Sequence, residues 1–159
     1  MNLCADGIYR KERFMDLGLS GRNALVSGAS RGIGRACALA LAEEGCNVAV
    51  FGRDEKLCVA VAEDIRARCP DSKIITVLAD LGMNPTVKQA VDEAAKALGG
   101  LDIVVNAAGG SARGGLGAVS HEEWHRRLNA KPLGLIAVCE AALPYLEESN
   151  QARLINLSG

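Results

Sequence analysis

The chain has 159 residues, of which 49% are hydrophobic and 23% charged, and 18 Lys and Arg nearly balance 19 Asp and Glu for a formal net charge of -1. This composition predicts one soluble globular domain that buries about two-thirds of its unfolded surface. The balanced charge and the lack of a clustered basic run exclude a nucleic-acid partner from our expectations. The sequence has no apolar run near the length of about 18 residues needed for a span and no secretory signal, so we expect no membrane partner and a cytoplasmic location.

From Asn23 onward, short apolar runs alternate with longer helical patterns, which is typical of βαβ units and a parallel sheet. The expected strands are residues 23–28, 46–51, 73–78, 101–106 and 152–157, and the expected helices are residues 32–44, 54–68, 85–98 and 121–149. Right-handed crossovers then predict a three-layer α/β fold, a doubly wound parallel sheet of the Rossmann type with strand order 3-2-1-4-5. Residues 1–14 show no clear period and are interpreted as an appended arm, which leaves 15–159 as the dinucleotide-binding domain.

A glycine-rich turn with the spacing G-x-x-x-G-x-G joins the first expected strand to the first expected helix. Such a turn lets the backbone approach a pyrophosphate and aims the positive end of a helix at it. Taken alone, the motif is equally compatible with a tight turn packed on the sheet. The residues of this turn that we predict to bind a cofactor are Gly28, Ser30, Arg31, Gly32, Ile33 and Gly34.

The end of the second strand, about 20 residues further on, is where a dinucleotide fold reads the adenosine ribose, with an acid for NAD or an arginine for NADP. This strand ends in Gly52, Arg53 and Asp54. Gly52 leaves room, and Arg53 together with Arg31 supplies planar cations suited to a 2′-phosphate. We therefore expect NADP(H) as the preferred cofactor, with NAD(H) possible through Asp54. In the alternative interpretation, Arg53 and Asp54 only solvate a loop and cap the next helix.

Three segments in register resemble the cofactor-site motifs of the short-chain dehydrogenase/reductase family. They are the glycine turn, then Asp80 and Leu81 after the third strand, and Asn106, Ala107, Ala108 and Gly109 after the fourth. The resemblance extends from about Leu19 to Gly159. It implies that Asp80 and Leu81 lie at the adenine and that the segment 106–109 lines the floor beneath the cofactor. It also implies hydride exchange between NADP(H) and a small-molecule carbonyl or alcohol substrate.

The pattern departs from the family where the catalytic residues are expected. The family carries a catalytic asparagine at a fixed place between a helix tryptophan and a glycine, and counting from Trp124 and Gly134 puts Lys131 at that place. Asn129, two residues earlier, lies about 200° around the helix and does not replace it. Pro132 predicts a kink at this point. Lys131 is therefore a candidate donor to a bound water or substrate, or else a solvated lysine.

The fifth expected strand resembles the family strand that carries the catalytic serine, and the family register puts Gly159 at the catalytic position with Ser158 just before it. Ser158 is therefore the second candidate catalytic residue, or else only a polar strand end. The family's Tyr-x-x-x-Lys proton-transfer motif would lie beyond residue 159, so we expect the isolated chain to be inactive. Tyr145 has Ser149 four residues later and offers no substitute. The sheet is thus expected to be truncated before its last strands. Strand 152–157 would be an exposed edge that recruits another strand, which predicts a homo-oligomer or aggregation.

Residues 121–125, His-Glu-Glu-Trp-His, match the H-E-x-x-H signature of zinc proteases through His121, Glu122 and His125. A zinc site needs a third protein ligand, and the chain has only 2 histidines, so we favour a chance match and expect no metal. Three hypotheses remain, in this order: an NADP(H)-dependent oxidoreductase of the short-chain type, a nucleotide-binding protein without catalysis, and a zinc hydrolase.

Overall fold

The computed structural model describes residues 16–82, 84–109 and 117–157, so the expected arm at 1–14 and Ser158 lie outside the described residues. The strands are β1 (Asn23–Ser27), β2 (Asn47–Gly52), β3 (Ile74–Leu78), β4 (Ile103–Asn106) and β5 (Arg153–Asn156). The helices are α1 (Gly32–Glu43), α2 (Glu55–Arg68), α3 (Asn84–Leu98), α4 (His121–Leu128) and α5 (Gly134–Glu147), with a π-helical turn η1 (Asn129–Leu133) between the last two.

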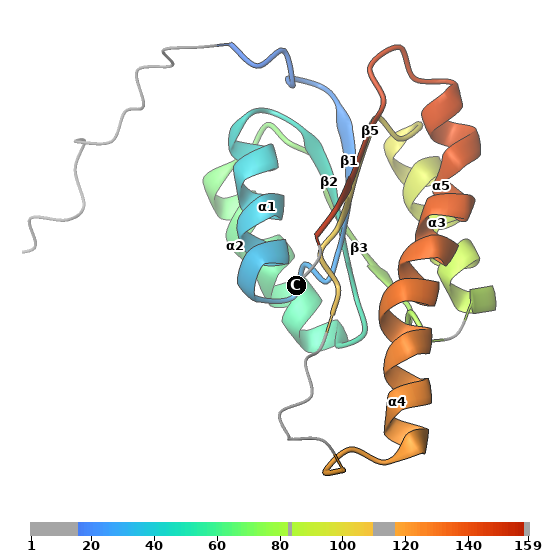
Figure 1. Cartoon of the computed structure of the whole chain (residues 1–159). Helices are drawn as coiled ribbons and strands as arrows, with labels where there is room; N and C mark the ends of the chain where they lie inside the picture. The colour runs from blue at the N-terminus through green and yellow to red at the C-terminus, as the bar shows by residue number, and fades with distance from the viewer. Residues whose placement is uncertain (1–15, 83, 110–116, 158–159) are drawn as a thin grey trace, which may run out of the picture.

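The strands form one parallel sheet with the order β3-β2-β1-β4-β5. Helices α1 and α2 cover one face of this sheet, and α3 and α5 cover the other (Figure 1). The predicted three-layer Rossmann-type fold and its strand order are therefore confirmed.

The central strands β1, β2 and β4 are almost continuous apolar runs because both of their faces are covered by helices. Along β1, Leu25 packs into the core on the α3 and α5 side, whereas Ala24 and Val26 pack into the core on the α1 and α2 side. All three side chains are fully buried. Successive side chains of a strand point to opposite faces, so one short run of sequence supplies both cores.

The long helix expected at residues 121–149 is interrupted by the π-helical turn η1. Pro132 lies in this turn and has no N–H to donate, and the Gly134 N–H bonds to the carbonyl of Asn129, five residues earlier. A Cβ built on Gly134 would lie 2.7 Å from the Leu81 Cβ, so this helix approaches the turn after β3 very closely. The kink predicted at Pro132 thus takes the form of a wider helical turn packed against Leu81.

Strand β5 forms one edge of the sheet, and its Leu154 and Ile155 side chains are each 45% exposed. An apolar edge of this kind favours pairing with a further strand. In the described part of the chain, no helix combines the length and the apolar character that crossing a membrane would require.

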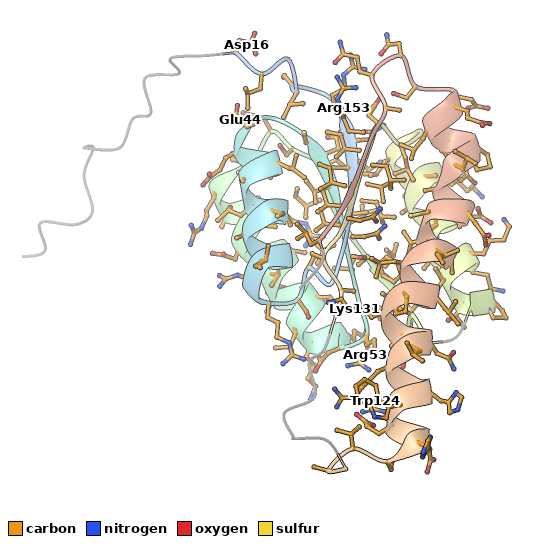
Figure 2. The ribbon with its side chains drawn as sticks, in the orientation of Figure 1. Asp16, Glu44, Arg53, Trp124, Lys131 and Arg153 are labelled. Carbon is orange, nitrogen blue, oxygen red and sulfur yellow. The ribbon has the colours of Figure 1, made fainter. Side chains whose placement is uncertain are left out.

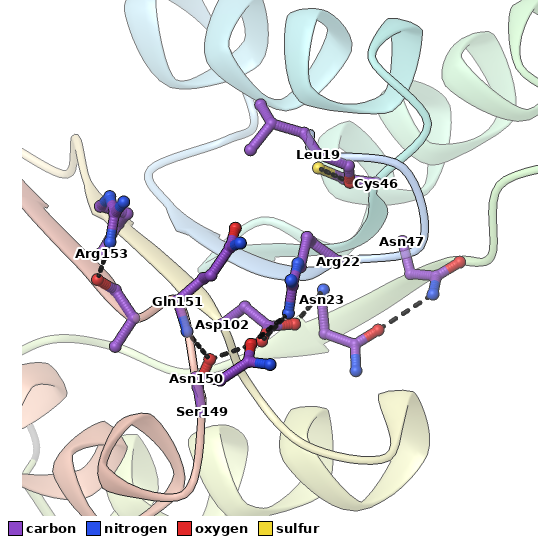
Figure 3. A network of polar contacts seen from close by, with 11 residues as sticks. Leu19, Arg22, Asn23, Cys46, Asn47, Asp102, Ser149, Asn150, Gln151 and Arg153 are labelled. Carbon is purple, nitrogen blue, oxygen red and sulfur yellow. Dashed lines mark hydrogen bonds and ion pairs between the residues drawn. The ribbon is translucent and has the colours of Figure 1, made fainter. Parts of the chain in front are cut away.

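A polar network at the amino ends of β1 and β4 is centred on Asp102 (Figure 3). Its carboxylate accepts hydrogen bonds from the Ser149 Oγ at 2.6 Å, the Asn23 backbone N–H at 2.9 Å and the Arg22 guanidinium at 3.3 Å. The Asp102 side chain is only 16% exposed. The network therefore ties β1, β4 and the end of α5 together at the end of the sheet opposite the strands' carboxyl ends.

Replacing Asp102 with alanine is expected to lower the free energy of unfolding by about 2–3 kcal/mol at neutral pH, because its donors lose a charged acceptor. Burial acts to raise the pKa of Asp102, but the hydrogen bonds from Ser149, Asn23 and Arg22 outweigh it and lower this pKa. A carboxyl group with a lowered folded pKa stabilises the fold above its unfolded pKa, and that stabilisation is lost as the pH falls through the folded pKa. The difference in the free energy of unfolding between wild type and Asp102→Ala should therefore become smaller below about pH 4.

Urea unfolding at several pH values measures this effect, with Asp64→Ala as the control. Asp64 also binds two arginines, Arg35 and Arg68, but it does so at the exposed surface, so its loss should change stability much less. Equal effects of the two substitutions would contradict the structural role of Asp102.

Candidate cofactor-binding site

A cavity of about 750 Å³ opens at the carboxyl ends of β1 to β4, with α4 and η1 forming its remaining wall. This is the place where open α/β sheets bind ligands, and the volume lies within the usual range for small-molecule sites. Figure 2 shows Arg53 and Lys131 at this end of the molecule, with Glu44 and Arg153 at the other end. The strand order therefore brings together residues that are far apart in the sequence.

The glycine turn is shaped by backbone contacts that exclude larger side chains. A Cβ on Gly28, whose φ is +70°, would lie 2.6 Å from the Ala108 Cα, and a Cβ on Gly34 would lie 2.3 Å from the Gly28 carbonyl oxygen. Gly32 has a φ of +56° with open space around it. Gly28 and Gly34 thus allow close packing of the backbone, and Gly28 and Gly32 allow the left-handed conformation of the turn.

The amino terminus of α1 faces the cavity through Gly32, Ile33 and Gly34. Arg31, the N-cap residue that precedes this helix, makes no side-chain capping hydrogen bond. The first N–H groups of a helix have no partner within the helix and lie at the positive end of its dipole. The turn is therefore able to bind a phosphate through backbone N–H groups.

The end of β2 presents Arg53 to the cavity while Asp54 has a structural role. The Asp54 carboxylate accepts a hydrogen bond of 3.1 Å from the Leu57 N–H and caps α2. The Arg53 guanidinium is 60% exposed and lies 3.8 Å from the Asp80 carboxylate. A Cβ on Gly52 would meet the Cys58 Sγ at 2.6 Å. Both Arg53 and Asp54 line the cavity, but the Asp54 Oδ1 is already used in the cap.

The floor of the cavity is built from the segment after β4. Ala107, Ala108 and Gly109 line the cavity together with Ser30, Asp80 and Leu81. Asn106 lies behind them and is fully buried: its side chain accepts a bond of 3.1 Å from the Ser27 Oγ and donates one of 2.9 Å to the Asn156 Oδ1. Asn106 thus joins β1, β4 and β5 beneath the floor, a structural position that the motif alone did not reveal.

Lys131 also lines the cavity, and its side chain lies along Gly109, with its Cε 3.4 Å from the place of a Cβ on that glycine. This candidate catalytic residue therefore lies on the cavity wall beside Gly109. Asn129 contacts a smaller adjoining cavity instead.

Helix α4 contributes three lining residues that the sequence analysis did not select: Glu123, Arg126 and Arg127. The Glu123 carboxylate accepts bonds of 2.7 Å from the Nε and Nη2 of Arg126 and from the Nε of Arg127. The hydrogen bonds from Arg126, then those from Arg127, lower the pKa of Glu123 to about 2. The spacing of these charges along one helix was the available signal, but it also describes an ordinary solvated face.

His121 and His125 are exposed on α4. Across the ranges that the structure describes, no three His, Cys, Asp or Glu residues are grouped closely enough to hold a metal ion. The zinc hypothesis therefore gains no support from the geometry.

The parallel sheet, the glycine turn and the cavity at the carboxyl ends define a Rossmann-type dinucleotide-binding domain. The family model described as short chain dehydrogenase matches residues 22–159. The chain belongs to this family of oxidoreductases.

Curated relatives and solved structures agree with this assignment. The 3-oxoacyl-[acyl-carrier-protein] reductase of Staphylococcus aureus strain Mu50 is 36% identical over 138 residues, which cover 86% of this chain and 55% of that protein. A short chain dehydrogenase from Burkholderia cenocepacia, solved with NADP, has a TM-score of 0.81 and 35% identity over 87% of this chain and 55% of its own. The L-sorbose reductase of Gluconobacter frateurii, with a TM-score of 0.84, 24% identity and coverage of 89% and 54%, shows the same fold. The chain thus spans about half the length of the relatives it matches.

Proposed function

We propose that this chain is the cofactor-binding portion of an NADP(H)-dependent oxidoreductase that interconverts a carbonyl and an alcohol. The observation that carries the proposal is the division of roles at the end of β2, where Arg53 faces the cavity and Asp54 caps α2. An arginine at this point complements a 2′-phosphate, and the Oδ1 of Asp54 is already used in the cap, which favours the arginine as the group that reads the ribose. The relative from Burkholderia cenocepacia was solved with NADP, which supports the same choice.

Each part of the cavity has a role in this proposal. The uncapped N–H groups of α1 would bind the diphosphate, and Arg31 and Arg53 would bind the 2′-phosphate. Asp80 and Leu81 would lie against the adenine, with the segment 107–109 beneath the rest of the cofactor. When bound, the nicotinamide would supply or accept the hydride. Lys131, which lies beside Gly109 in the cavity wall, would donate a hydrogen bond to a water or substrate. The catalytic role of Ser158 stays a prediction.

The substrate is proposed only as a small carbonyl or alcohol compound. The relative from Staphylococcus aureus reduces a 3-oxoacyl group carried on a protein, but this chain covers 55% of it. The activity of the whole protein is therefore a proposal, as are its assembly into a homo-oligomer and its cytoplasmic location.

A nucleotide-binding protein without catalysis is the second candidate, because Lys131 stands where the family pattern has an asparagine. The coding sequence after Gly159 separates the two functions. A downstream Tyr-x-x-x-Lys would favour the enzyme, whereas a stop codon would favour the binding protein.

Binding of NADPH about tenfold tighter than NADH is expected, because an exposed arginine contact to a phosphate contributes on the order of 1–2 kcal/mol. Isothermal titration calorimetry of both cofactors with the purified protein measures the ratio. Equal affinities would contradict the assignment of NADP(H).

A further inference from the structure

The described lining of the cavity carries more basic than acidic side chains. Among its described lining residues, five are basic and three are acidic, namely Arg31, Arg53, Arg126, Arg127 and Lys131 against Asp54, Asp80 and Glu123. Asp54 is engaged in the cap of α2 and Glu123 binds two of the arginines. The excess of positive charge favours an anionic ligand, and the positions of the arginines decide which of its groups they contact.

Two of these basic residues come from separate elements but line the same small space. Arg53, at the end of β2, and Arg126, on α4, both line the main cavity and an adjoining one of about 180 Å³, which they share with Asp80 and Ala130. A space of this size holds about six water molecules, comparable to one phosphate group with its nearest waters. Figure 2 shows Arg53 at the same end of the molecule as Lys131 and Trp124.

Asp80 links the two arginines electrostatically. Its carboxylate lies 3.8 Å from the Arg53 Nη1, and its negative charge, after the stronger effect of the bonded Glu123, raises the pKa of Arg126. Asp80 thus forms an ion pair with Arg53 and lines the same small space as Arg126. An incoming phosphate would carry more negative charge than Asp80 does, which favours its contact with both arginines.

The Arg126 guanidinium is already oriented by its helix. Its Nε and Nη2 donate to the two carboxylate oxygens of Glu123, three residues earlier, at 2.7 Å each. This bidentate interaction with Glu123 does not use the Nη1 donors of Arg126. An arginine that is held in place before the ligand arrives loses less side-chain entropy when it binds.

We propose that Arg126 on α4 is a further residue that selects the phosphorylated cofactor, together with Arg53 on the other side of the small cavity. The inference rests on the proposed NADP(H) preference and adds a contact from α4 to it. The sequence analysis assigned this selectivity to Arg31 and Arg53 alone.

The test is the ratio of NADPH to NADH affinity, measured by calorimetry at low ionic strength for the wild type and for Arg126→Ala. The substitution is expected to weaken NADPH binding about fivefold and to leave NADH binding within about twofold, because only NADPH carries the extra charge. Arg68→Ala is the matched control: it removes an exposed arginine at the far end of α2, and both affinities should stay unchanged.

The possible outcomes separate the inference from the function on which it rests. A wild type that prefers NADPH, with the same preference retained in Arg126→Ala, overturns the role of Arg126 and leaves the proposed function intact. A wild type without preference overturns both. A uniform loss of both cofactors in Arg126→Ala counts against selection by Arg126, and Arg126→Lys, which keeps the charge on the helix, should then restore binding of both.

Discussion

Replacing Arg53 with aspartate is expected to weaken NADPH binding by about 100-fold and to leave NADH binding within about threefold. The change removes a charge-assisted contact and introduces a charge that repels the phosphate, and each effect is on the order of 1–2 kcal/mol at an exposed site. The change also removes the cation whose Nη1 now lies 3.8 Å from the Asp80 carboxylate. With one cation lost and one acid added at this end of the cavity, the preference for NADPH should be lost or reversed.

Calorimetric titration of NADPH and NADH measures this prediction, with Arg53→Gln as the control that removes the charge without adding an opposite one. The glutamine variant should lose about tenfold in NADPH affinity, which is less than the aspartate variant loses. In the wild type, the preference should also increase as the pH rises through about 6, where a phosphate monoester acquires its second charge. A similar NADPH affinity in wild type and Arg53→Asp would show that Arg53 does not contact the phosphate.

The fold could be predicted from the sequence because the central strands are covered on both faces. Strands such as β1 and β4 are therefore short, nearly unbroken apolar runs, and the helices between them begin or end at recognisable residues. Asp54 and Ser120, for example, accept hydrogen bonds from the first turns of α2 and α4. The order of the parallel strands then follows from the handedness of the crossovers, which is almost always the same.

The parts of the site whose residues are close together in the sequence could also be predicted. The glycine turn and Arg53 follow directly after their strands, so spacing alone located them. The same reasoning left two roles open for Asp54. The structure shows it in the cap of α2, because the Leu57 N–H lies within reach of its carboxylate.

The contribution of α4 could not be predicted, because it depends on tertiary contacts. Which face of this helix meets the cavity depends on the π-helical turn, which changes the rotation of all residues before it relative to α5. It also depends on the close contact between Gly134 and Leu81. Without these two facts, Arg126 and Arg127 are indistinguishable from solvated charges on a helix.

The burial of Asn106 has a similar explanation. Its motif indicates the cofactor floor, but its hydrogen-bond partners, Ser27 and Asn156, come from strands that lie 79 and 50 residues away in the sequence. A buried amide needs partners for its donors and acceptor, and only the strand order shows that these two side chains are in place.

Replacing Gly34 with alanine is expected to lower the free energy of unfolding by about 1–3 kcal/mol, because the new methyl group overpacks a backbone contact. Its Cβ would lie 2.3 Å from the Gly28 carbonyl oxygen, and a backbone atom does not move aside as a flexible side chain does. Helix α1 must then move away from the glycine turn, and its first N–H groups move with it. Losing one such hydrogen bond to the diphosphate corresponds to about a tenfold loss of affinity, which NADPH and NADH should show equally.

Gly32→Ala is the matched control, since its Cβ would meet nothing within 4 Å and only its φ of +56° is unfavourable. That substitution should cost roughly 1–2 kcal/mol, and Gly32→Asn less, because asparagine tolerates the left-handed conformation. Gly28→Ala combines a positive φ with a contact of 2.6 Å to the Ala108 Cα and should be the most damaging of the series. Urea unfolding and cofactor titration of the three variants together separate the effect of a positive φ from the effect of a close backbone contact. If Gly34→Ala kept the stability and the affinities of the wild type, α1 would not need the close approach that the structure shows, and the diphosphate would have to be bound by other groups.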